Sequence, residues 1–253
     1  MFANDSFIGQ IIITIIGGVL VAIIIALGTY FRPKMKPFVY NIFRKSVKKR
    51  RVYKRIREAK VITFFYNRAI LRTDAGTVRD YIERATNEVY LIGCWLSTTL
   101  NDEDLKNVII EQIDKGVAFY FCFSGWEDSA LTMYSRYFNM SREDVIESLY
   151  SSYNMLLSIR ESLPIELRKN LNILYHNQLV VTALWAADPK SQNALYKLDH
   201  RVIRGDVKSA YGFEFYSSPK CQFDDTIWKG YKEVLLSATP IYEMPDGIKT
   251  LRN

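Results

Sequence analysis

The residues with the clearest chemical potential surround one of the two histidines of the chain. His176 ends a predicted strand, and Asn177 and Gln178 follow it directly. Ligands of α/β sheets bind at such strand ends, and an imidazole there can act as a nucleophile or general base. His176 is therefore the one candidate catalytic residue. The alternative, which the usual burial of polar groups favours, is a hydrogen-bonded structural histidine.

Other polar residues are candidates for a ligand-binding edge. Ser124 and Gly125 leave a second buried strand into a loop, where an anionic ligand can approach backbone N–H groups. Asp188 begins a turn after a third strand. Ordinary turn chemistry is the alternative for these positions. The predicted ligand-binding set is Ser124, Gly125, His176, Asn177, Gln178 and Asp188.

Metal and cofactor chemistry has no support in the sequence. Cys94, Cys122 and Cys221 are widely separated and form no CxxC pair, which disfavours a zinc site and a disulfide framework and favours reduced, buried thiols. No nucleotide-binding or metalloprotease motif occurs. We expect neither metal nor cofactor. His200, between Asp199 and Arg201, is predicted to join a solvated ion cluster.

Alternating strands and helices must position these residues. Residues 88–95 form an apolar run typical of a buried strand, 101–115 a helix with acids in its first turn, and 117–123 the next strand. This β-α-β order predicts a parallel pair. The sequence thus predicts an α/β domain over 61–237 and a tail over 238–253. Further elements are predicted as helices within 128–163 and 226–237 and strands at 171–175, 180–186, 194–203 and 209–216.

An apolar segment precedes this domain. Residues 7–31 carry no charge, and a helix of that length spans a hydrocarbon core of about 30 Å. We therefore expect one transmembrane helix within residues 1–31. Small and polar residues recur along it at four-residue spacing, a pattern that lets helices approach closely in lipid. Self-association of the spans is expected, and a plain tether is the alternative. The predicted packing stripe contains Thr14, Gly18, Ala22 and Ala26.

A basic segment follows the apolar run. Residues 32–60 hold thirteen Lys and Arg and one acid, which leaves residues 61–253 with a net charge of −4. Positive flanks stay on the cytoplasmic side, so we expect a single-pass inner-membrane protein with its N-terminus outside and its main domain cytoplasmic. The segment is predicted to lie as a helix on anionic lipid. Nucleic acid is the disfavoured alternative, because the charge is not spread over the fold.

The order of elements resembles one lobe of the phospholipase D-like superfamily, over about residues 64–235. The strand with Gly93 and Trp95 carries this likeness, together with the segments LKNVIIEQIDKGVAFYFCFSGWED, LNILYHNQLVVTALWAADP and SAYGFEFYSS, and the helix with Trp228 and Tyr231. The resemblance implies an α/β lobe whose catalytic edge lies at the strand ends.

The catalytic signature of that family is not matched. It reads His-x-Lys, then Asp after four further residues, whereas His176 is followed by Asn177 and Gln178, and Ala183 takes the aspartate position. His200 lacks the lysine as well. The reaction needs a histidine nucleophile, a cation for the phosphoryl oxygens and a second histidine as general acid. The sequence therefore predicts a degenerate site and favours a protein that is not an enzyme.

The resemblance also implies a context, because bacterial proteins with such a lobe on a membrane anchor are often found in anti-phage defence or signalling. We expect a sensor or effector whose domain binds a ligand or a partner protein from the same operon. It would act at the inner membrane as a homo-oligomer, through assembly of its spans. The alternatives are a membrane-tethered phosphodiesterase or nuclease that uses His176, and a non-catalytic membrane scaffold.

Overall fold

The computed structural model describes residues 49–65, 78–95, 103–200, 211–219 and 223–252. The chain divides into two compact units, residues 1–55 and 56–253. No helix within the described ranges is both long enough and apolar enough to cross a bilayer. The predicted span, with Thr14, Gly18, Ala22 and Ala26, lies outside them. The described part of the basic segment is helical over residues 49–58, as predicted.

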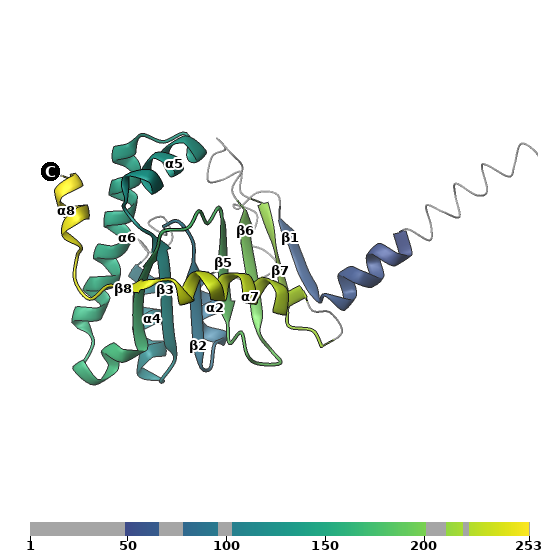
Figure 1. The fold of residues 1–253 in the computed structure, drawn as a ribbon. Helices are drawn as coiled ribbons and strands as arrows, with labels where there is room; N and C mark the ends of the chain where they lie inside the picture. The colour runs from purple at the N-terminus through teal and green to yellow at the C-terminus, as the bar shows by residue number, and fades with distance from the viewer. Residues whose placement is uncertain (1–48, 66–77, 96–102, 201–210, 220–222, 253) are drawn as a thin grey trace, which may run out of the picture. The chain divides into compact units, whose positions relative to one another are not determined.

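Within the described residues, eight strands of the second unit form one sheet, in the order β1-β7-β6-β5-β2-β3-β4-β8 (Figure 1). Its strands are β1 (Val61–Phe65), β2 (Glu88–Ile92), β3 (Ala118–Ser124), β4 (Leu171–His176), β5 (Thr182–Ala187), β6 (Leu195–His200), β7 (Tyr211–Tyr216) and β8 (Thr239–Pro240). The helices are α2 (Val78–Arg84), α4 (Glu103–Asp114), α5 (Asp128–Phe138), α6 (Arg142–Ser162), the 3-10 helix η2 (Ile165–Asn170), α7 (Phe223–Leu236) and α8 (Asp246–Arg252). The predicted α/β class is confirmed.

The predicted β-α-β unit is also confirmed. β2 and β3 pair in parallel, with α4 between them in the chain, and β4 adds a second parallel pair on β3. β5 follows β4 in the chain but pairs antiparallel to β2 instead. Two consecutive strands therefore lie on opposite sides of the β2–β3 pair.

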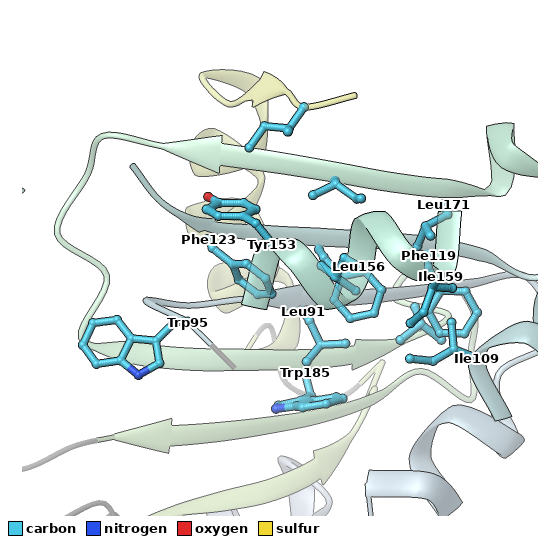
Figure 2. Packing of buried hydrophobic residues seen from close by; sticks show 14 of the residues in the cluster. Leu91, Trp95, Ile109, Phe119, Phe123, Tyr153, Leu156, Ile159, Leu171 and Trp185 are labelled. Carbon is cyan, nitrogen blue, oxygen red and sulfur yellow. The ribbon is translucent and has the colours of Figure 1, made fainter. Parts of the chain in front are cut away.

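Helices cover both faces of the sheet (Figure 1), and a hydrophobic cluster packs on each face. On one face, helices α2, α4, α5 and α6 contribute apolar side chains such as Leu156, which packs in the cluster with Leu91 of β2 (Figure 2). On the other face, α7 supplies Trp228, whose ring meets Tyr90 edge-on at 4.8 Å, while Tyr90 stacks on Tyr120 at 4.5 Å. Burial on both faces explains why the central strands are apolar runs without polar alternation.

The long helical region after β3 is two helices. Asn139 takes a left-handed conformation, with φ of 52°, and ends α5, which suits the tolerance of asparagine for that region. Ser141 then caps α6, because its side chain accepts a hydrogen bond from Asp144 N–H at 3.0 Å. This is an N-cap hydrogen bond, the kind that serine commonly makes at a helix start.

The segment expected as a tail belongs to the fold. Residues 238–253 contribute β8, which pairs antiparallel with β4, and α8, which packs against α6. Ile241 and Ile248 are buried in the main core cluster. The lack of sequence periodicity here reflects a two-residue strand and a seven-residue helix, both too short to set up a visible pattern.

Candidate functional site

The parallel strands β2, β3 and β4 end at one edge of the sheet, and this edge gathers most of the predicted site. Ser124 and His176 are register partners at the ends of β3 and β4. The N–H of Gly125 donates to the carbonyl of His176 at 2.7 Å, and the N–H of Ser124 donates to the carbonyl of Cys94 at 3.0 Å. The chain segments that leave the three strands are therefore joined by backbone hydrogen bonds.

Both ring nitrogens of His176 are occupied by backbone groups. The N–H of Gln178 donates to Nδ1 at 3.3 Å, and Nε2 lies 3.2 Å from the carbonyl oxygen of Gly93. Since Nδ1 accepts, the network assigns the ring proton to Nε2, which donates to Gly93. The side chain is 1% exposed, and burial lowers the pKa of His176, against the opposing hydrogen bond to Gly93. This is a neutral imidazole with no nitrogen lone pair directed at a substrate.

The segment after His176 is held from two sides. The Tyr134 hydroxyl donates to the carbonyl of Gln178 at 3.1 Å and accepts from the N–H of Val180 at 3.2 Å. On the other side, the Gln178 amide donates to Ser237 Oγ at 3.0 Å. The predicted ligand-binding side chain of Gln178 is thus already used within the protein, and Ser124 is fully buried. Asn177 and Gln178 are the exposed polar residues of the predicted set at this edge.

Gly125, Asn177 and Glu127 converge at this edge, where Asn177 is exposed, Gly125 is buried and Glu127 Oε2 is a buried oxygen with no hydrogen-bond partner among the described residues. A Cβ on Gly125 would collide with Asn177 Oδ1 and Glu127 Oε2, so the glycine is what lets these two side chains close over it. Glu127 adds negative charge, and the neighbouring Asp128 is paired with Arg142 at 2.5 Å. Carboxylate and amide oxygens accept hydrogen bonds, so this surface suits a ligand that donates them and not a phosphate.

Asp188 is not brought to this edge. β5 runs antiparallel to β2, so its end lies beside the start of β2, at the opposite edge of the sheet. There the carboxylate accepts from the N–H groups of Thr86, Asn87 and Glu88 at 2.8, 2.8 and 2.9 Å. Burial would raise the pKa of Asp188, but these hydrogen bonds outweigh it and lower the pKa. The residue fixes the entry into β2.

A second polar cluster was missed by sequence reasoning. Four polar side chains meet between the sheet and α2: Lys197 and Asp199 of β6, Glu214 of β7 and Tyr81 of α2. Lys197 and Glu214 are register partners on the two neighbouring strands. Lys197 Nζ lies 3.6 Å from Asp199 Oδ2, and Lys197, Asp199 and Glu214 are 6, 4 and 0% exposed. Charged residues at alternate positions of the apolar strands LYKLDH and YGFEFY were the available signal.

The electrostatics of this cluster differ from those of the His176 edge. Burial raises the pKa of Glu214, Tyr81 and Lys197 oppose that rise, and Asp199 adds to it. The predicted solvated ion cluster around His200 is corrected here, because Asp199 is buried. The Nδ1 atom of His200 lies 2.7 Å from Thr182 Oγ1, and the centre of its ring lies 5.0 Å from the centre of the Tyr211 ring.

Comparisons with known proteins give a likeness of fold. No protein-family model matches the chain, and no curated protein matches it. Among solved structures, the chain is similar to Nuc from Salmonella typhimurium, a phospholipase D family member, at 8% identity and a TM-score of 0.41, over 66% of this chain and 89% of that one. It is also similar to TrmBL2, an archaeal chromatin protein that binds DNA, at 12% identity and a TM-score of 0.39, over 85% and 69%. Similarity at this level assigns no activity.

Proposed function

We propose that this chain is a membrane-anchored sensor or effector whose α/β domain binds a ligand or partner and does not cleave phosphodiesters. The observation that carries the proposal is the state of His176, with both ring nitrogens hydrogen-bonded to backbone groups and the ring out of solvent. A nucleophilic histidine must direct a lone pair at phosphorus, and this one would first have to break two hydrogen bonds.

The catalytic signature also fails in a second alignment. The signature can also be aligned so that its aspartate falls on Asp188, which follows the end of β5. The His and Lys positions then fall on Val181 and Ala183. Ala183 packs closely on β2, since a Cβ on Gly93 would lie 3.2 Å from Ala183 Cβ. A lysine stem at position 183 would meet the end of β2. Both alignments therefore support a degenerate phospholipase D-like site.

The ligand class follows from the exposed part of the edge. Asn177 is exposed, and beside it over Gly125 lies the buried Glu127 Oε2, which has no hydrogen-bond partner among the described residues, so a partner that inserts an amine, guanidinium or amide donor fits them. A basic segment of a protein partner is such a group. In this proposal the partner binds at the strand ends, and the signal passes to the membrane through the oligomer.

The membrane part of the proposal rests on the sequence. The uncharged run over residues 7–31 and the basic segment over 32–60 support a single span with the domain on the cytoplasmic side of the inner membrane. The resemblance stated above supports a role in bacterial anti-phage defence, in which assembly of the spans damages the membrane or arrests growth.

The enzymatic alternative is tested on the full-length protein in detergent. Cleavage of bis(4-nitrophenyl) phosphate and of DNA is measured for the wild type, His176→Ala and the matched control His200→Ala. We expect no turnover above background in any of the three. Turnover in the wild type that is lost in His176→Ala and kept in His200→Ala would contradict the proposal.

Assembly of the spans is tested separately. Gly18→Ile with Ala22→Ile removes two small residues of the predicted stripe, and we expect a smaller oligomer in detergent and a loss of cell toxicity. An unchanged oligomer and unchanged toxicity would favour the scaffold alternative.

A further inference from the structure

Glu127 is an acidic residue at the start of α5 that does not cap its own helix. A carboxylate at such a position is stabilised when it accepts a hydrogen bond from the N–H groups of the first turn, but the Glu127 side chain accepts none. Its Oε2 atom is buried and has no hydrogen-bond partner in the part of the chain that the structure describes. The neighbouring cation, Arg142, pairs with Asp128 instead. An acceptor that is removed from water and left without a donor destabilises a fold, so a ligand that supplies the donor is favoured here.

A second acceptor lies beside that oxygen. Asn177 Oδ1 and Glu127 Oε2 both lie under 3.0 Å from the point where a Cβ of Gly125 would be, and Asn177 is exposed. Hydrogen bonds from a charged nitrogen to an oxygen are about 2.7–2.9 Å long, so one nitrogen next to that point can donate to both oxygens. Gly125 makes this approach possible, because every other residue would place its Cβ against the two oxygens.

The loop that carries Glu127 is held in place by Trp126. The Trp126 ring lies 4.6 Å from the Tyr175 ring on β4 and 6.2 Å from the Tyr153 ring on α6. It also meets α8, where a Cβ on Gly247 would lie 2.8 Å from Trp126 Cδ1. Glu127 lies near the same aromatic layer, since burial raises the pKa of Tyr153 and the Glu127 charge adds to that rise. The acceptors are therefore positioned before a ligand arrives, and charges interact more strongly beside such a layer than in water.

The arrangement of the two acceptors selects among the possible donors. A guanidinium binds best to both oxygens of one carboxylate, through two parallel hydrogen bonds in one plane. Here the acceptors belong to two different side chains, and Glu127 contributes only one buried oxygen. An ammonium carries three donors on a single nitrogen, which suits two acceptors that converge on one point. A Ca²⁺ ion takes about six to eight oxygen ligands, more than this pair of side chains supplies.

We propose that the site at Gly125, Glu127 and Asn177 binds a primary ammonium group, as a lysine side chain of a partner presents it. This inference rests on the proposed function and deepens it, because it names the group that the partner inserts at the strand ends. The ammonium donates to Glu127 Oε2 and to Asn177 Oδ1, and the Glu127 carboxylate compensates its charge. Arginine is a poorer ligand because its donors are spread over a plane, and acetylated lysine is poorer because it has lost its charge. A free alkylamine carries the same group, and the test separates the two sources.

The test is a calorimetric titration of the full-length protein in detergent. The probes are the peptide acetyl-Gly-Lys-Gly-amide, the same peptide with its lysine acetylated, the arginine counterpart, and butylamine. We expect the lysine peptide to bind at least about tenfold more tightly than the acetylated peptide, and more tightly than the arginine peptide. Tighter binding of the lysine peptide than of butylamine assigns the ammonium to a protein partner, and equal binding assigns it to a free amine.

Variants of the two acceptors test the site itself. Glu127→Gln keeps the shape of the side chain and removes its charge, so it should lower the affinity for the lysine peptide by at least about tenfold. Asn177→Ala removes a neutral acceptor and should lower the affinity by a smaller factor, about twofold to tenfold. Glu166→Gln is the matched control, because Glu166 is exposed on η2, which leads into the start of β4, and it should leave the affinity unchanged.

Three results would overturn this inference. The first is a lysine peptide that binds no better than its acetylated form, and the second is tighter binding of the arginine peptide. The third is an unchanged affinity in Glu127→Gln, which would mean that the Asn177 amide donates to Glu127 within the protein. The proposed function has its own test in His176-dependent turnover, so a preference for arginine without turnover leaves that function standing and this inference wrong.

Discussion

His176 and Glu214 are both buried on the same sheet, but they are satisfied in opposite ways. His176, at the end of the parallel strand β4, is neutral and hydrogen-bonded to backbone groups of Gly93 and Gln178. Glu214, in the antiparallel strand β7, lies among ionisable side chains that include Lys197 and Asp199. A buried polar group that is hydrogen-bonded to the backbone lowers the stability of the fold little. A buried charge is tolerated only while the opposite charge that compensates it is present.

This difference shows which side of the domain is sensitive to charge. At the His176 edge, the strand ends themselves supply the hydrogen bonds, so the histidine stabilises the fold without carrying charge. In the cluster of Lys197, Asp199 and Glu214, removal of the lysine leaves two buried carboxylates with less positive charge to compensate them. The following variants test that contrast by thermal and urea unfolding of the full-length protein in detergent.

The largest effect is expected for Lys197→Ala. It leaves Asp199 and Glu214 buried without their cation, and we expect a loss of about 3–5 kcal/mol in the free energy of unfolding. Lys190→Ala is the control, because Lys190 pairs with Glu88 at 3.2 Å at the surface and should cost at most about 1 kcal/mol. Equal losses in the two variants would show that the cluster is not a coupled charge site.

The second largest effect is expected for His176→Ala, which should lower the free energy of unfolding by about 2–3 kcal/mol. The substitution leaves a cavity and two backbone groups without hydrogen-bond partners. The wild type should also lose stability as pH falls below about 6.5, since the unfolded histidine then takes up a proton that the buried one resists. The variant should lack that part of the pH dependence. A His176→Ala protein as stable as wild type would remove the structural role.

Glu214→Gln should stabilise the protein at neutral pH, by about 1 kcal/mol. The folded pKa of Glu214 is raised, so its contribution is present below the unfolded pKa of about 4.3 and is lost as pH rises through the folded value. The gain should therefore be absent at low pH. A destabilised Glu214→Gln protein at neutral pH would mean that the carboxylate is needed in its charged form.

The smallest effect on stability is expected for Gly125→Ala. The new methyl group meets only the ends of the Asn177 and Glu127 side chains, which can move aside, so the cost should stay below about 1 kcal/mol. Binding of a basic peptide at this edge should weaken nonetheless, in a titration followed by calorimetry. Ser191→Ala, at the opposite edge near Asp188, is the control and should leave binding unchanged.

The sequence predicted the strands and helices that carry strong patterns, and it failed where contacts between distant segments decide. The parallel pair β2–β3 followed from apolar runs around an amphipathic helix. The position of β5 beside β2 did not, and so Asp188 was expected near His176 although it lies at the opposite edge. Position in the chain cannot show which strands become neighbours.

The sequence predicted which residues meet at the candidate site, but it did not predict what these residues do there. Ser124, Gly125, His176, Asn177 and Gln178 do meet at one edge, because parallel strands end together. The hydrogen bonds that occupy the His176 ring come from Gly93 and Gln178 backbone atoms, which leave no trace in residue types. Asp199 was predicted to join a solvated ion cluster, because the sequence does not show that it lies buried beside Lys197 and near Glu214.

The protonation state of His176 decides whether the histidine is a structural residue or a catalytic candidate. The chain has two histidines, so long-range nitrogen–proton spectra of ¹⁵N-histidine-labelled full-length protein give two ring systems, and His200→Gln assigns them. We predict that the His176 ring is neutral at neutral pH, with its proton on Nε2, and that it titrates below the ordinary histidine value of about 6.5 because it is buried. A His176 ring that titrates near pH 6.5, or that carries its proton on Nδ1, would contradict it and return the histidine to the role of a catalytic candidate.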